Sequence, residues 1–340
     1  MMKFLFFLVV VILGVANGTA DQGNDHNGAE HKALCHVLKA AVHEWESKGD
    51  GLLEPLKTAL HRTIFGNETG GSLETLRNGL PKVYDDVLGG ADSRNMACGQ
   101  VRNAGGDYYN VHQPRWSGHS APHDLVCLCT LGNNSWPLND TQKATTLCGQ
   151  EKSALGAEKG TNGWSAMNTG KEQMEATWGS VVVQCLESGG NENSLKEALK
   201  SFTGKLVHKP GGGYSNSKQL GEGDPDEVFA CTGSSIKGVC VEYYPTLTAH
   251  TWWVDLDKAI EEDHQIQKER EEEQRRRQQE DSEKKETAQE AVLKSTHTIT
   301  NQTEAPNKDK LHESMRKLNL TSGTPISKPS SWLLSVVFLF

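Results

Sequence analysis

The sequence of 340 residues lacks any uninterrupted apolar run of about 20 residues, the length that a helix needs to cross a bilayer core. Its two longest apolar runs lie near the ends, at 4–15 and 332–340, and both are too short for a stable transmembrane helix. Basic residues are not in excess either, since the net charge is −9. This charge gives no signature of nucleic-acid binding, and we expect no nucleic-acid partner.

Motifs for catalysis are also missing. The segment His43-Glu44-Trp45-Glu46-Ser47 lacks the second histidine of a zinc-protease helix, and the glycine run 211–213 lacks the lysine and hydroxyl residue of a phosphate-binding loop. No Ser/His/Asp or paired-carboxylate arrangement is recognisable. His112, His119 and His123 could bind a metal, but we interpret them as solvated loop histidines. The sequence predicts no enzyme, no catalytic residue, no metal and no cofactor.

Cysteine is absent after Cys240, and all eight cysteines lie between Glu30 and Tyr244. In a secreted chain an even number predicts disulfides, four if all pair, although eight cysteines allow 105 connectivities. The first pairing that we favour is Cys231–Cys240, because Gly233 and Gly238 let the intervening segment turn back within the strand-like stretch 227–244. The eight cysteines are Cys35, Cys98, Cys127, Cys129, Cys148, Cys185, Cys231 and Cys240.

The apolar run 124–131 contains two of these cysteines. Its composition predicts a short strand, in which Cys127 and Cys129 point to the same face and reach cysteines in one covering layer. A catalytic or metal-binding C-x-C motif is the alternative, and the disulfide-permissive context disfavours it.

Both ends of the chain resemble processing signals. Residues 1–20 have a lysine, an apolar stretch and small residues before a polar segment, which is typical of a signal peptide. At the other end, small residues, a polar spacer and the apolar tail 332–340 are typical of a signal for a glycosylphosphatidylinositol (GPI) anchor. We expect attachment at Ser322, with Gly323 as the alternative, because transfer needs small side chains at the cleavage position and the two that follow. A terminal strand or helix docked in a core is the other interpretation.

Apolar residues at three- and four-residue spacing predict helices in the first 206 residues. The second helix should end at Gly66, and Ser72 is a candidate N-cap for the third, which Pro81 could kink. In the fourth, Met167, Met174, Trp178, Val181 and Cys185 form a heptad seam that an antiparallel partner would bury. The predicted helices cover 34–45, 52–64, 73–88, 164–186 and 195–206.

The composition changes after Trp253. Residues 258–290 hold almost no large apolar side chain, and Glu271, Glu272 and Glu273 each precede an arginine by four residues, which favours a solvated helix over a disordered linker. Residues 295–321 resemble a glycosylated tether. We expect a signal peptide at 1–20, a disulfide-bonded head at 21–254, a charged stalk and tether at 255–322, and a removed anchor signal at 323–340. The expected N-glycosylation sites are Asn67, Asn133, Asn139, Asn301 and Asn319.

The order of signal peptide, disulfide-bonded head, charged stalk, tether and anchor signal resembles that of the variant surface glycoproteins of African trypanosomes, in a form with a short C-terminal region. The features that support the resemblance are Ala33-Leu34-Cys35 in an N-terminal helix, the segment 126–130, a second helix through Trp178 and Cys185, and the anchor signal from Ser322 onward. Many members carry a small cysteine-rich C-terminal domain, and because no cysteine follows Cys240 we expect the charged stalk to take its place here.

The resemblance implies a mainly α fold, with an elongated head on a long antiparallel helical hairpin, small β and loop elaborations, and a helical or disordered stalk. It also implies homodimers in a GPI-anchored coat on the outer leaflet of the plasma membrane, which meets host antibodies and evades them by antigenic variation. We expect the helical head to form the dimer contact. The alternative is a scarce GPI-anchored receptor for a host protein, and an anchored enzyme is a third possibility.

Overall fold

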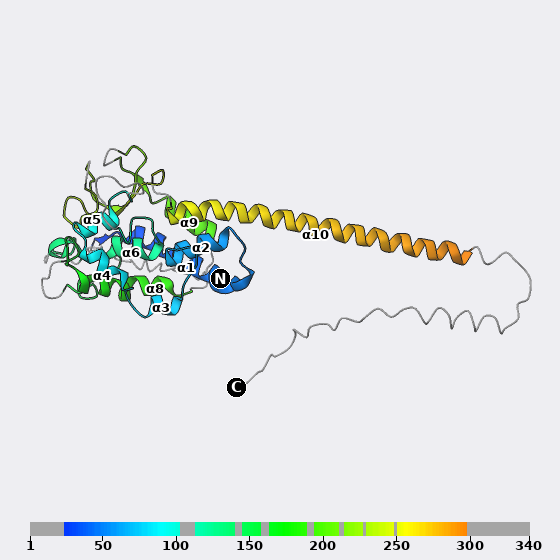
Figure 1. Ribbon diagram of the computed structural model, residues 1–340, viewed down its shortest axis with the longest axis horizontal. Coiled ribbons are helices and arrows are strands. Elements are labelled where there is room, and N and C mark those ends of the chain that lie inside the picture. Colours follow the sequence, from blue (N-terminus) through cyan, green and yellow to red (C-terminus); the bar gives the residue numbers. More distant parts are fainter. Residues whose placement is uncertain are drawn as a thin grey trace, which may run out of the picture. The chain divides into compact units, whose positions relative to one another are not determined.

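The structure of the protein is a computed structural model that describes residues 24–102, 113–139, 145–157, 163–188, 194–210, 214–226, 229–247 and 250–297. The chain divides into two units, Met1–Arg270 and Glu271–Phe340. We call the first the head unit, and it contains all eight cysteines. The fold is mainly helical, as the sequence predicts, with a few short strands (Figure 1).

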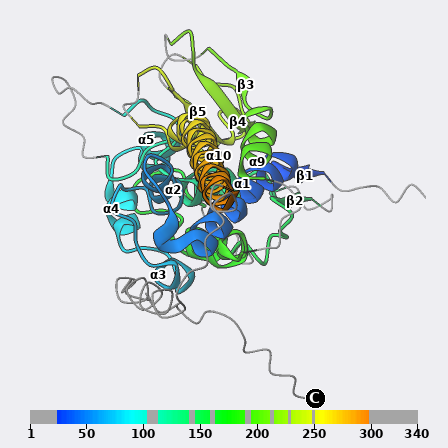
Figure 2. The same cartoon turned by 90° about the vertical axis from the view of Figure 1, so that its right-hand side faces the viewer.

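Helix α1 (Gly28–Lys48) is the longest helix that lies wholly within the described part of the head unit. Leu34, Val37, Leu38 and Ala41 are fully buried on one face, and Gly49 ends the helix with a φ of 47°. It packs against α2 (Leu56–Phe65), α6 (Ala121–Cys129), α8 (Val183–Leu186) and α9 (Leu195–Thr203). In the end-on view of Figure 2, α9 lies beside α1.

The short helices of the head unit begin and end at the residues that helix chemistry favours. The Ser194 hydroxyl accepts from the Glu197 amide while the Glu197 carboxylate accepts from the Ser194 amide, which caps α9 reciprocally. Gly66 ends α2 in the left-handed conformation, and Ser72 caps α3 (Leu73–Arg77) by accepting from the Thr75 amide, as predicted. The predicted kink is instead a break, because α4 (Val83–Gly89) begins as a separate helix; α5 (Ser93–Cys98) follows.

The 124–131 strand prediction is wrong, because this segment lies largely in helix α6. The Ser120 hydroxyl accepts from the His123 amide at 3.3 Å, and Pro122 stands in the first turn, where its missing N–H is not needed. Every residue of α6 is buried. When a helix is buried on all sides, its sequence is a nearly continuous apolar run without a helical period. Periodicity therefore cannot distinguish such a helix from a buried strand.

The fourth predicted helix is shorter than expected. The regular part consists of α7 (Lys171–Thr177), the π-helical η3 (Trp178–Val182) and α8, and the side chain of Met167, before it, is 50% exposed. Met174, Trp178, Val181 and Cys185 of the seam are buried as predicted. The described head unit contains several short helices packed on α1, and a long antiparallel hairpin is not confirmed.

The strands form two small sheets. β1 (Asp25–His26) pairs in parallel with β2 (Thr146–Leu147), and β3 (Val207–His208), β4 (Lys218–Glu222) and β5 (Val239–Tyr243) form an antiparallel sheet in that order (Figure 2). Of the predicted strand region 227–244, the described part is a strand only in β5. The described part of the head unit also contains two 3-10 turns, η1 (Gly49–Gly51) and η2 (Asn133–Ser135).

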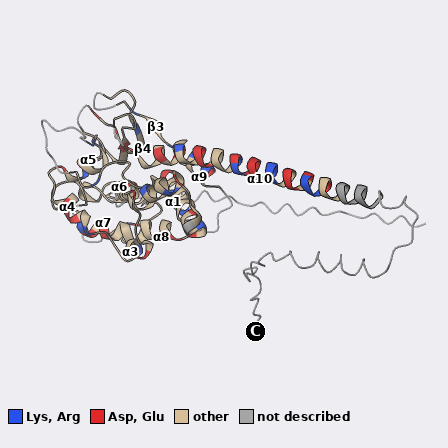
Figure 3. Cartoon of the chain, turned by 45° about the vertical axis from the view of Figure 1, so that its right-hand side comes forward, with Lys and Arg blue, Asp and Glu red and all other residues tan. Residues whose placement is uncertain are grey.

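Helix α10 (Trp252–His297) begins in the head unit and continues into the second unit. Its first turns are apolar on one side, where Trp252, Leu256 and Ala259 are buried at helical spacing. From Glu271 to Gln289 every side chain is exposed, and Figure 3 shows acidic and basic residues interspersed along the helix. The stalk is therefore helical through His297.

Candidate functional site

Four disulfides use all eight cysteines, and the predicted Cys231–Cys240 bridge is confirmed. Cys35–Cys185 joins α1 to α8, Cys98–Cys127 joins α5 to α6, and Cys129–Cys148 joins the end of α6 to the turn after β2. Residues two apart on a helix point to different sides. Cys127 and Cys129 therefore bind partners on different sides of α6, and the prediction that they share one face is wrong.

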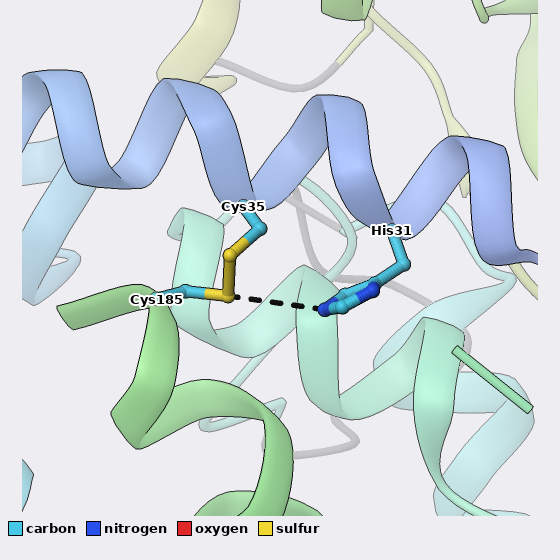
Figure 4. A group of neighbouring side chains, drawn as sticks. All are labelled: His31, Cys35 and Cys185. Atoms are coloured by element: carbon cyan, nitrogen blue, oxygen red, sulfur yellow. Dashed lines mark hydrogen bonds between the residues drawn. A yellow bond between two sulfur atoms is a disulfide. The ribbon is translucent and has the colours of Figure 1, made fainter. Parts of the chain in front are cut away.

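His31, Cys35 and Cys185 lie together and have the residue types of a metal site (Figure 4). His31 Nε2 is 3.9 Å from the Cys185 sulfur, but both sulfurs belong to one disulfide and offer no thiolate. Burial lowers the pKa of His31 to about 4, so its ring is neutral at physiological pH. A single imidazole beside a disulfide is a poor metal site, and we interpret the group as a covalent link between two helices.

Two of the three histidines that we expected to be solvated are instead buried, and His112 lies outside the described residues. His123 is fully buried in α6, with its Nε2 3.0 Å from the Ala97 carbonyl and its Nδ1 3.1 Å from the Tyr84 hydroxyl. Burial lowers its pKa to about 3, so the ring is neutral, donates to the carbonyl and accepts from Tyr84. Burial also holds the pKa of His119 well below its ordinary value.

A buried carboxylate joins α6 to the start of α10, and sequence reasoning missed it. Asp124 accepts hydrogen bonds from the Tyr243 hydroxyl at 2.8 Å, the Trp252 indole at 2.7 Å and the Gly118 amide at 2.9 Å. Burial raises the pKa of Asp124 to about 7, although these three donors favour its charged form. The signal in the sequence was an aspartate at the head of the longest apolar run between the termini.

A buried arginine holds another junction of the head unit. Arg94 donates to the carbonyls of Cys127 at 2.8 Å, Trp164 at 2.9 Å and Leu131 at 3.3 Å, and its guanidinium lies 5.1 Å from the Trp164 ring centroid. No carboxylate pairs with it among the described residues. Burial lowers its pKa to about 9, which still leaves it cationic at neutral pH.

The predicted modification sites fall into two groups. Asn67, Asn133 and Asn139 are exposed in the head unit, although Ser135, the hydroxyl residue of the second sequon, is buried, and Thr141 of the third lies outside the described residues. Asn301, Asn319, Ser322, Gly323 and the whole of residues 1–20 and 323–340 also lie outside them.

A family model described as a trypanosomal VSG domain matches residues 39–279. The chain belongs to this family. Its members are surface coat proteins of trypanosomes and have a structural role, not a catalytic one. No curated protein matches the chain.

The match covers most of the described head unit and extends into α10 as far as residue 279. The Asp124 junction and three of the four disulfides lie wholly inside it, and the fourth, Cys35–Cys185, has its first cysteine just before it. None of the helices in the described part of the chain is long and apolar enough to cross a membrane.

Proposed function

We propose that this VSG-family chain is a GPI-anchored coat protein that covers the outer face of the plasma membrane and evades host antibodies by antigenic variation. The single observation that supports the proposal most is the VSG-domain match over residues 39–279. The fold agrees with a shielding role, because a cross-linked head is followed by a charged helix whose side chains from Glu271 to Gln289 are exposed.

Anchoring is proposed from the sequence pattern at the C-terminus. The small residues from Ser322 onward and the apolar tail fit a GPI signal, with Ser322 as the attachment residue and Gly323 as the alternative. Two lipid chains give stable but laterally mobile attachment, since burial contributes about 0.8 kcal/mol per methylene group. The mature protein then consists of the head at 21–254 and the stalk and tether at 255–322.

Glycans and dimerisation are further parts of the proposal. Sugars at Asn67, Asn133, Asn139, Asn301 and Asn319 would enlarge the volume that each copy shields. A homodimer through the helical head suits a coat, because paired heads leave less membrane open. From Glu271 to Gln289, α10 offers no apolar seam to a second copy.

Enzymatic release combined with a copy count tests this proposal. Intact cells are surface-labelled and treated with a phosphatidylinositol-specific phospholipase C, and the released protein is quantified by mass spectrometry. We expect this chain to be released and to dominate the labelled surface protein. Persistence in the detergent phase after confirmed lipid cleavage contradicts the anchor, whereas release at low copy number contradicts the coat role and supports a receptor.

A further inference from the structure

The sequon at Asn67 stands beside a small pocket on the head unit. The pocket has an empty volume of about 410 Å³, its open mouth included, and Asn67 itself forms part of its wall together with Glu68, Arg102, Trp116 and His119. A side chain that lines a pocket and also accepts a covalent group delivers that group to the pocket mouth.

The conformation of the sequon is fixed by hydrogen bonds. The Asn67 side-chain oxygen accepts from the Thr69 amide at 2.9 Å and from the Thr69 hydroxyl at 3.0 Å. This Asx turn leaves both residues exposed and follows Gly66, which ends α2. The amide nitrogen that would receive a sugar donates to the Phe65 carbonyl at 3.5 Å and belongs to an exposed residue.

The floor beside Asn67 offers groups suited to a sugar ring. The Arg102 guanidinium lies 3.6 Å from the centroid of Trp116, and the Trp116 and His119 rings meet edge-on at 4.4 Å. Guanidinium groups donate to hydroxyls, and the half-buried Trp116 ring offers apolar surface to the C–H groups of a sugar. Arg62 and Glu68, which pair with each other, add polar groups at the rim.

One ring nitrogen of His119 makes no hydrogen bond within the described residues. Its ring lies directly under the backbone before Asn67, because a Cβ on Gly66 would come within 1.9 Å of the ring. Its Nδ1 is buried and has no hydrogen-bond partner within the described part of the chain. An unsatisfied buried polar atom costs stability, and a ligand group that reaches it removes that cost.

We propose that the pocket beside Asn67 is a carbohydrate subsite that holds the first N-acetylhexosamine of the glycan on Asn67. The inference rests on the glycosylation of Asn67, which belongs to the proposed function. The held sugar covers Trp116, which also approaches the His250 carbonyl at 3.4 Å just before α10. The glycan thereby shields the region where the first turn of α10 joins the rest of the head unit.

Deglycosylation of the native glycoprotein tests the subsite. Full-length protein released from cells is treated with peptide N-glycanase in labelled water, and the conversion of asparagine to aspartate is timed by peptide mass spectrometry. Asn139, also exposed, is the matched control. We expect release at Asn67 to be roughly tenfold slower than at Asn139, which corresponds to about 1.4 kcal/mol, and equal once the protein is reduced and denatured.

Variants separate a held sugar from simple crowding. Arg102→Ala and Trp116→Ala each remove one wall, and we expect either to bring the rate at Asn67 towards that at Asn139. Arg102→Ala is the safer variant because Arg102 is half-buried and pairs with no carboxylate in the described residues. Equal native rates at the two sites, or slow release that neither variant changes, overturn the subsite. An unmodified Asn67 also overturns it, but leaves the coat function and its anchor intact.

Discussion

The head unit and the charged part of α10 are stabilised in different ways. In the head unit Leu34, Leu60 and Leu125 are fully buried, and four disulfides connect the elements. From Glu271 to Gln289 no side chain is buried, and helix propensity and charge pairs alone stabilise the helix. Substitutions should therefore have large effects in the first region and small ones in the second.

The boundary between the two kinds of stabilisation lies within one helix. Trp252, Leu256 and Ala259 give α10 an apolar stripe that ends after two turns. Beyond it the sequence keeps strong helix formers and removes the stripe (Figure 3). One helix can thus contribute to a core with its first turns and have only exposed side chains from Glu271 to Gln289.

Loss of the Cys35–Cys185 disulfide should have the largest effect in the head unit. The chain-entropy relation gives about 5 kcal/mol for this bridge, which spans 150 residues, and about 2.6 kcal/mol for Cys231–Cys240, which spans 9. We expect the paired variant C35A/C185A to lower the free energy of unfolding by roughly twice as much as C231A/C240A. Unfolding in guanidinium chloride measures the loss in unfolding free energy for both paired variants. Equal losses would contradict a dominant role for loop length.

Truncation of Arg94 should be nearly as damaging. Arg94→Ala removes the Arg94 donor from the buried carbonyls of Cys127 and Trp164, whereas the Leu131 carbonyl keeps the Trp164 amide at 2.8 Å. The substitution also opens a cavity, and we expect a total cost of about 4 kcal/mol. Arg277→Ala is the matched control, because Arg277 is 73% exposed on α10. If Arg94→Ala lowered the free energy of unfolding by less than about 1 kcal/mol, water would be replacing the guanidinium. At this position the expected difference between the head unit and the charged part of α10 would then be contradicted.

Asp124 should make the head unit more stable as the pH falls. Its pKa is about 7 in the folded protein and 3.8 ordinarily, so the folded state binds the proton more tightly. The contribution of Asp124 to the free energy of unfolding therefore increases as the pH falls from about 8 towards 4. Buried histidines such as His123, whose folded pKa is lowered, act in the opposite sense below pH 6.5.

The difference between the wild type and a variant isolates this contribution. We expect the stability of the wild type relative to Asp124→Asn to rise as the pH is lowered from 8 to 5, by about 1 kcal/mol or more. Glu242→Gln is a second test of the same relation, because burial also raises the pKa of Glu242 to about 7 and the same trend is expected there. If the stability of the wild type relative to Asp124→Asn does not change between pH 8 and pH 5, the three donors to Asp124 keep its carboxylate charged over this whole range.

The sequence predicted what depends on local pattern. The α2 end at Gly66, the Ser72 cap, the buried part of the Met174–Cys185 stripe and the Cys231–Cys240 bridge follow from spacing and short-range chemistry. Of the three predicted charge pairs in the stalk, Glu273–Arg277 is present at 2.6 Å.

The errors arise where burial comes from distant parts of the chain. Helix α6 is covered on every side, so its apolar run has no period, and His119 and His123 are buried by residues far away in the sequence. The junction joins Asp124 to Trp252, 128 positions later in the sequence, and no local pattern predicts that contact. A polar residue beside a long apolar run was the available signal, and it indicates a buried network only once the fold is known.

The smallest effect should come from the charged part of α10. Glu273 and Arg277 form an ion pair four residues apart in the favourable orientation, with exposed fractions of 49% and 73%. Such a pair stabilises a helix by about 0.2–0.5 kcal/mol and is screened by salt, so Glu273→Ala should leave the unfolding midpoint of the head unit unchanged. A small loss of helical circular dichroism at low salt, absent at 1 M salt, is the expected result.

Glu273→Pro is the contrasting change, because proline removes a hydrogen bond and costs about 3 kcal/mol of helix stability at that point. If Glu273→Pro also lowered the midpoint of the head unit, the solvated part of the helix would be coupled to the core, and the two regions would not be independent.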